Sequence, residues 1–214
     1  MRSFWFAPAC IVAMAIFGAA IYHRLPEQVP PVWLVINTEE VRDRIWAVAL
    51  SPAFTACLWL FWVLSPYIDP RRASYKTFIG SYRFIINAGI LLYTVLHIAG
   101  LVALLGWPIS VFQILVIGWG LLHMAAGNEM GRVRAAYFIG VRTPWTLSDP
   151  VIWQRTHRVG ARLMFVTGLF VALVGLFCPV DIALPIMLAM IVSTTLFLYW
   201  YSYHLSRQNI KVKP

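Results

Sequence analysis

Charged side chains are scarce in this sequence. Only 12% of its 214 residues are Asp, Glu, Lys or Arg, whereas 61% are hydrophobic. A water-soluble domain carries charge on about a quarter of its residues, because much of its surface must face water. The composition therefore excludes a soluble domain and a disordered chain, and it predicts an integral membrane protein.

Cysteine is also rare. The sequence holds three, Cys10, Cys57 and Cys178, and all of them fall in apolar stretches. An odd number without a Cys-x-x-Cys pair gives neither a disulfide framework nor a cysteine metal site. We interpret them as small apolar residues within the bundle.

Six stretches without charge are each long enough to cross a bilayer core, which takes about 20 helical residues. Transmembrane β-strands need only about ten residues, so the sequence predicts an all-α membrane protein with a bundle of six transmembrane helices. Since only Arg2 precedes the first stretch, we expect an uncleaved helix there rather than a secretory signal. The stretches are Phe4–Tyr22, Trp46–Ile68, Phe84–Gly106, Pro108–Asn128, Leu163–Val180 and Ile182–Leu205.

Lys and Arg are distributed unevenly between the connections. Fourteen of the seventeen lie at the two termini and in the connections after spans two and four, and three lie in the connection after span one. Because cytoplasmic segments collect Lys and Arg, we expect both termini in the cytoplasm. We therefore attribute the net charge of +9 to the cytoplasmic flanks of the membrane helices, and not to binding of a nucleic acid.

Very short turns join spans three and four and spans five and six into hairpins. We therefore expect two units. The first, residues 1–83, has two helices and an extracytoplasmic Pro-rich loop. The second, residues 84–214, has four helices and a cytoplasmic loop over residues 128–162.

The outer loop, His23 to Ile45, begins with closely spaced prolines that include Pro26 and Pro30. Proline fixes φ and lacks an N–H donor, so we expect an extended arm, with Trp33 folded back onto the membrane interface. The segment 37–44 predicts a short helix capped by Asn37 or Thr38. A solvated linker and an extracytoplasmic recognition surface both remain open as interpretations.

The inner loop combines six arginines with apolar bulk, which a purely solvated loop does not need. Asp149 followed by Pro150 is typical of a helix start, and that helix is expected to run unbroken into span five. We predict that the loop residues form one folded unit under spans four and five. The residues are Arg142, Trp145, Trp153, His157 and Arg158.

The histidines invite a haem or metal interpretation. His97 lies nine residues from the outer turn and His123 fifteen, which places them about 13 Å and about 22 Å from that turn along their helices. Because the two ligands of one haem must lie at the same level, we do not expect this pair to bind haem. A metal or proton site of His123, Glu129 and His157 lacks the spacing of a known motif. No span carries a charge in its middle, and no nucleophile–base pattern is present, so we expect neither a cofactor nor an enzyme.

Several parts of the segment that ends span four and forms the inner loop resemble the pattern of the SdpI family. They are Gly127–Met130, Tyr137–Ser148, Val151, Trp153 and Thr156–Arg158. Ala135 or Ala136 stands where that family has asparagine. The front half resembles, more weakly, a domain of unknown function, with Val32 in place of its histidine. The matching functional residues are Asn128, Gly140, Arg142, Thr143, Pro144, Trp145, Thr146, Trp153, His157 and Arg158, with Pro26, Pro30 and Trp33 in the outer loop.

The resemblance implies a six-span protein of the bacterial plasma membrane that protects its cell against a secreted antimicrobial peptide toxin. It also implies that a cytosolic regulator can be sequestered at the inner side. Two other classes remain open from the residues alone: an accessory subunit of a larger membrane complex, and a small transporter or channel.

Overall fold

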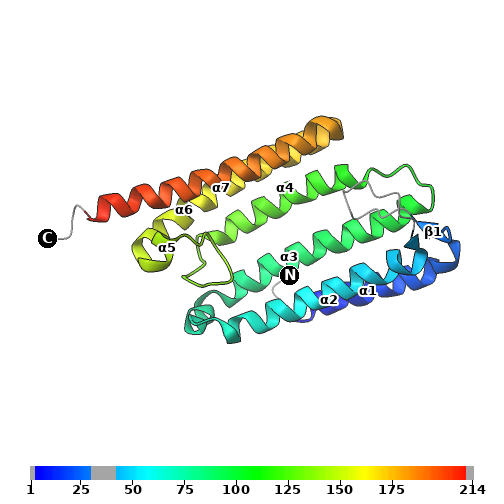
Figure 1. The fold of residues 1–214 in the computed structure, drawn as a ribbon, viewed down its shortest axis with the longest axis horizontal. Coiled ribbons are helices and arrows are strands. Elements are labelled where there is room, and N and C mark those ends of the chain that lie inside the picture. The colour runs from blue at the N-terminus through cyan, green and yellow to red at the C-terminus, as the bar shows by residue number, and fades with distance from the viewer. Residues whose placement is uncertain (1–2, 30–41, 211–214) are drawn as a thin grey trace.

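A computed structural model describes residues 3–29 and 42–210. Six of its helices are long and apolar enough to cross a membrane, which confirms the predicted all-α architecture. They run roughly along the long axis of the molecule (Figure 1). These helices are α1 (Phe6–Ile21), α2 (Arg44–Ile68), α3 (Arg72–Leu104), α4 (Val111–Met130), α6 (Pro150–Phe177) and α7 (Val180–Ile210). The smaller elements are the 3-10 helix η1 (Tyr22–Arg24), the strands β1 (Gln28–Val29) and β2 (Arg42–Asp43), and the short helix α5 (Pro144–Ser148).

The helices pack as two groups of three. Helices α1, α2 and α3 contact one another, as do α4, α6 and α7, and the contact of α3 with α4 joins the groups. The predicted boundary after residue 83 therefore falls inside α3, and the division into two units remains a prediction.

Three helices are longer than a bilayer core requires. Helix α3 has 33 residues, α6 has 28 and α7 has 31, whereas about 20 residues suffice for the hydrocarbon region. Helix α3 begins at Arg72 rather than at the predicted Phe84, because the charged residues of its first turns hid its start from a search for uncharged stretches. The surplus turns of α3 and α6 lie at the α5 end of the bundle (Figure 1).

Helices α4 and α6 approach each other closely through glycine. A Cβ on Gly120 would lie 2.4 Å from the backbone nitrogen of Ala172, and one on Gly168 would lie 2.6 Å from the carbonyl oxygen of Gly120. Gly127 and Gly175, one heptad further along each helix, are similarly crowded. In a membrane, helix association depends on such close packing, because lipid is as apolar as the side chains. Glycine therefore fixes the α4–α6 contact.

The β1 end of the bundle carries the connection between α1 and α2. Val29 is buried in a cluster with residues of α1, α2 and α3, and it pairs with Arg42 across the two short antiparallel strands. Asp43 caps α2 by accepting a hydrogen bond from the Ile45 amide at 2.9 Å. The prediction of a helix over residues 37–44 is wrong for Arg42 and Asp43, which form a strand paired with β1.

Other predictions for this connection concern residues that the structure does not describe. Pro30, Trp33 and the predicted caps Asn37 and Thr38 all lie in the range 30–41, outside the described residues. Pro26 is described and exposed.

Candidate functional site

Residues 131–149, here called the loop module, connect α4 to α6 at the α5 end of the bundle (Figure 1). Val133, Ala136 and Ile139 are buried there, and they form one apolar cluster with aromatic residues of α3 and with Trp153 of α6. The interleaved apolar residues seen in the sequence thus serve as the interior of a folded segment.

Trp153 and His157, in the first turns of α6, support the loop module. Their rings stack with centroids 4.0 Å apart, and the Trp153 Nε1 donates to the Val133 carbonyl at 2.9 Å. His157 Nε2 accepts from the Val141 amide at 3.0 Å, so the proton lies on Nδ1, which donates to the Trp153 carbonyl at 2.8 Å. Both ring nitrogens are engaged in holding the module, which leaves neither available to a metal ion.

Gly140 allows the chain to turn above these two rings. Its φ is +102°, a conformation that side chains with a Cβ rarely adopt. A Cβ there would lie 2.5 Å from His157 Nε2 and 2.9 Å from the Trp153 ring. Glycine is therefore required at this position by backbone conformation and by space together.

The Thr143–Thr146 segment begins helix α5. Thr143 is the N-cap, Pro144 occupies the first turn, and Thr143 and Thr146 exchange hydrogen bonds as a capping box. Thr143 Oγ1 lies 3.0 Å from Ser202 Oγ of α7, and both threonines are buried. The sequence analysis missed this helix, although threonine followed by proline is the same type of start signal as Asp149–Pro150.

Asp149 caps α6 by accepting from the amides of Val151 and Ile152 at 2.7 and 3.3 Å, which confirms the predicted helix start. Helix α6 then continues without interruption to Phe177, as predicted. Two helix starts therefore follow each other within the SdpI-like segment.

Trp145 ties the module to the end of α7. Its ring packs against Tyr199 at 5.1 Å and Tyr203 at 5.0 Å between centroids. Aromatic contacts of this geometry stabilise by about 0.5–1.5 kcal/mol beyond simple burial. The long α7 is thus part of the support for the module.

Asp69, in the turn between α2 and α3, contacts the loop module and was not among the residues predicted from the sequence. It is only 2% exposed, and its carboxylate accepts hydrogen bonds from the Arg71 amide at 2.7 Å, the Tyr75 hydroxyl at 2.9 Å and the Tyr137 amide at 2.8 Å. The last of these bonds links the α2–α3 turn to the loop module. Its position directly after an apolar span is compatible with a cap, but nothing in the sequence indicates Tyr137 as its partner.

Arg71 makes a second link between the same segments. Its guanidinium donates to the Leu147 carbonyl and lies over the Tyr137 ring, 5.3 Å from the centroid. Such a cation–π contact is worth about 0.5–1 kcal/mol at an exposed site. The α2–α3 turn is therefore fastened to the module at both of its ends.

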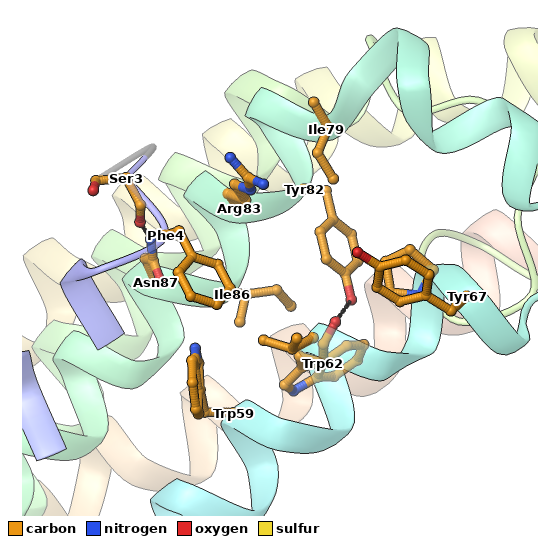
Figure 2. Close-up of a pocket in the computed structure, with 12 residues that line it drawn as sticks. Ser3, Phe4, Trp59, Trp62, Tyr67, Ile79, Tyr82, Arg83, Ile86 and Asn87 are labelled. Carbon is orange, nitrogen blue, oxygen red and sulfur yellow. Dashed lines mark hydrogen bonds between the residues drawn. The ribbon is translucent and has the colours of Figure 1, made fainter. Parts of the chain in front are cut away.

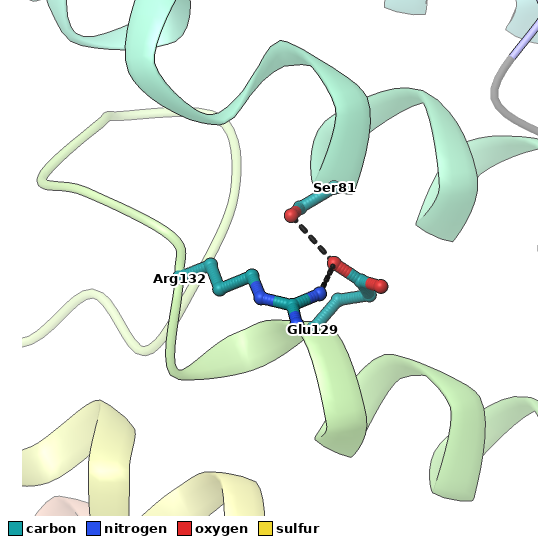
Figure 3. A network of polar contacts seen from close by, with 3 residues as sticks. All are labelled: Ser81, Glu129 and Arg132. Carbon is teal, nitrogen blue, oxygen red and sulfur yellow. Dashed lines mark hydrogen bonds and ion pairs between the residues drawn. The ribbon is translucent and has the colours of Figure 1, made fainter.

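Glu129 joins α3 to the last turn of α4 (Figure 3). It is 3% exposed, and its Oε2 accepts from the Ser81 hydroxyl at 2.5 Å and from Arg132 at 2.9 Å. The site considered with His123 and His157 does not form: among the residues that the structure describes, no group of three His, Cys, Asp or Glu could hold a metal ion. Instead, His123 stacks on Trp119.

The predicted unit separates into an interior and a surface. Trp153 and His157 are buried, whereas Arg142 and Arg158 are exposed, and Arg142 donates to the Tyr137 carbonyl at 2.7 Å. Pro144 and Asn128 are exposed as well. All six arginines of the 128–162 segment are exposed, namely Arg132, Arg134, Arg142, Arg155, Arg158 and Arg162.

These features define a multi-pass helical membrane protein with a folded, cationic loop module at one end. Residues 132–202, which include most of the module, match the model of the SdpI/YfhL protein family. The chain is also similar to the immunity protein SdpI of Bacillus subtilis (strain 168), with 25% identity over 185 residues, covering 85% of this chain and 87% of that protein. The resemblance to the SdpI family is confirmed. No solved structure matches the chain.

Replacing Gly140 by alanine is expected to open the module, because the new Cβ collides with His157 and Trp153 and the positive φ becomes strained. We expect trypsin to cleave after Arg142 about tenfold faster, the change that about 1.4 kcal/mol of local destabilisation produces. Limited proteolysis of the purified full chain in detergent, followed by mass spectrometry, measures this rate.

Gly131→Ala is the matched control, because its φ is not positive and its Cβ would meet only the Ala161 side chain at 4.0 Å. This variant should be cleaved at the wild-type rate. Equal rates for the two variants would contradict the role assigned to Gly140.

Replacing Asp69 by asparagine is expected to loosen the module without changing its sequence. The amide offers one acceptor oxygen and an NH₂ group, so at least one of the three buried donors loses its partner, at a cost of about 1–3 kcal/mol. Hydrogen exchange should become faster at the Tyr137 amide and its neighbours. Asp181→Asn, at an exposed position in the first turn of α7, should leave this exchange unchanged, and a similar change in both variants would refute the link.

Proposed function

We propose that this chain is a membrane immunity protein of the bacterial plasma membrane. It protects the cell that makes it against a secreted peptide toxin, and it holds a cytosolic regulator on the loop module. The observation that carries the proposal is the similarity to an immunity protein over most of both chains, with the family match lying on the folded module.

The orientation that this function requires places the loop module and both termini in the cytoplasm. The excess of Lys and Arg on that side supports it, because cytoplasmic flanks of membrane helices collect these residues. The β1 end then faces outward, where a secreted toxin arrives. The exposed residues His23, Arg24 and Pro26 lie at this end.

The surface of the module suits an acidic partner. Six exposed arginines of residues 128–162, three of them in the module and three in α6, surround a buried scaffold, and the nearby carboxylates of Asp69 and Glu129 are buried and hydrogen-bonded. Arrays of one charge on a folded surface favour fast and specific association with a partner of opposite charge. A regulator with an acidic face is the partner that this chemistry would recognise.

A toxin at the β1 end can affect the module only through the helices between them. This requires two arrangements of the bundle, with different affinities for the toxin. The contact of α3 with α4 is where the two three-helix groups meet, and Asp69, Arg71 and Glu129 cross between these groups at the α5 end. A small shift between the groups would therefore reach the module directly.

Sidedness can be tested with single cysteines in a variant whose three native cysteines are replaced by serine. Glu27→Cys, near β1, should react with a membrane-impermeant maleimide in intact cells. Ser148→Cys, in α5, should react only after the cells are opened. Both positions are exposed in the structure, so the reverse pattern would contradict the proposed orientation.

Protection can be tested in a toxin-sensitive strain that expresses the wild-type chain and is challenged with the peptide toxin encoded nearest its gene. We expect survival with the wild-type chain and its loss with Trp145→Ala, because the module then loses its contact with α7. Arg142→Ala should also abolish protection or signalling, because it removes a cation of the module surface and the hydrogen bond to Tyr137.

Arg72→Ala, an exposed arginine at the start of α3 and outside the loop module, is the control for lost charge and should leave protection intact. Immunoblots of membrane fractions confirm that all variants are present at equal levels. If the wild-type chain gives no protection, immunity is the wrong function, and the accessory-subunit interpretation takes its place.

A further inference from the structure

A small pocket lies between the start of α1, the last turns of α2 and the first half of α3 (Figure 2). Its volume is about 110 Å³, whereas a cavity needs only about 10–15 Å³ by the same measure to hold one water molecule. It therefore has room for a group of the size of a phosphate. Five of the twelve residues that line it are aromatic, and Arg83 supplies the cation. The aromatic residues are Phe4, Trp59, Trp62, Tyr67 and Tyr82.

Arg83 marks the edge of the apolar region. After it, no charged residue occurs until Glu129. Helix α1 begins at the same level, since the Asn87 side chain donates to the Ser3 carbonyl at 2.9 Å. The pocket is thus placed where the hydrocarbon core gives way to lipid headgroups, in the leaflet at the α5 end.

The wall of the pocket is held in a fixed shape. The Tyr82 hydroxyl donates to the Trp62 carbonyl at 2.6 Å and lies 2.5 Å from Ser65 Oγ, which joins α3 to α2 (Figure 2 shows the first of these bonds). A preformed wall reduces the conformational entropy that a ligand must remove on binding.

The Arg83 side chain is exposed, and its guanidinium lies 6.0 Å from the centroid of the Phe4 ring. Among the residues that the structure describes, it makes no ion pair. Arg72 and Lys76 precede it on α3, before the kink at Phe78, and both are exposed. The charge that Arg83 brings to the pocket is therefore positive, and no ion pair with a described residue neutralises it.

We propose that this pocket binds the phosphate of an anionic phospholipid, with Arg83 as its ligand and the aromatic wall against the glycerol backbone and the first acyl carbons. Arginine is suited to this task, because its planar fork of donors matches two phosphate oxygens. A lipid is favoured over a soluble phosphate ester, because the remaining wall is apolar and the adjacent face of α2 exposes Leu60 and Leu64. Basic pockets between transmembrane helices bind lipid headgroups by this chemistry.

The proposal can be tested by native mass spectrometry of the full chain, purified in detergent, stripped of lipid and titrated with phosphatidylglycerol or phosphatidylcholine. We expect one phosphatidylglycerol to bind at concentrations at which phosphatidylcholine does not. Arg83→Gln should weaken this binding about tenfold, a typical loss for one charge-assisted contact. Trp59→Leu should weaken it less, because the charge remains.

Arg72→Gln is the matched control, because it removes the same charge from the same helix nearer to its start. It should change binding by less than about twofold, as expected for a screened surface charge. Equal losses in Arg83→Gln and Arg72→Gln would overturn the proposal in favour of a general surface attraction.

Two further outcomes would also overturn it. Both lipids carry a phosphate, but the choline cation makes phosphatidylcholine neutral overall, so equal binding of the two would show that the pocket does not select an anionic lipid. Displacement of the lipid by millimolar glycerol 3-phosphate or inorganic phosphate would identify a soluble phosphate as the ligand. An unchanged thermal unfolding midpoint of Arg83→Gln confirms that the variant is folded, as expected for an exposed side chain.

Discussion

A carboxylate buried at the end of a membrane bundle is stable only if hydrogen-bond donors replace the water that it has lost. Asp69 receives three such donors, from its own turn, from α3 and from the loop module. One side chain thus sets the position of three segments that are distant in the sequence. Tyr137 directly follows Ala136, a buried member of the apolar cluster around Trp153, so this polar contact holds the chain at the edge of that cluster.

At the same end of the bundle, one set of residues holds the loop module in place and another set carries its positive charge. Four residues of the SdpI-like pattern, Thr143, Thr146, Trp153 and His157, are buried, and their polar atoms bond to one another, to the backbone or to a neighbouring helix. The arginines point outward and carry the charge. The pattern thus combines residues that hold the module together with exposed arginines, Arg142 and Arg158, that are accessible to a partner.

Much of this fold could be predicted from the sequence, because hydrophobic length is a strong signal for a transmembrane helix. The helix start at Asp149 was equally readable, since a cap and a proline are local features. The start of α3 was not, because Arg72 and Arg83 lie on the part of the helix beyond the apolar stretch. The contact of Asp69 with Tyr137 could not be predicted at all, because it joins residues 68 positions apart and depends on how three segments pack.

The glycine contact between α4 and α6 has a consequence for the segment that connects them. Because these two helices are pressed together through Gly120 and Gly168, the ends of the module are held at a fixed separation whether or not the module itself is folded. The entropy of closing this loop is then lost when the helices associate in the membrane, and not when the module folds. Residues 131–149 can consequently hold one conformation with only a small apolar interior. A modest change in the packing of α4 against α6 then alters the separation of their ends and destabilises that conformation.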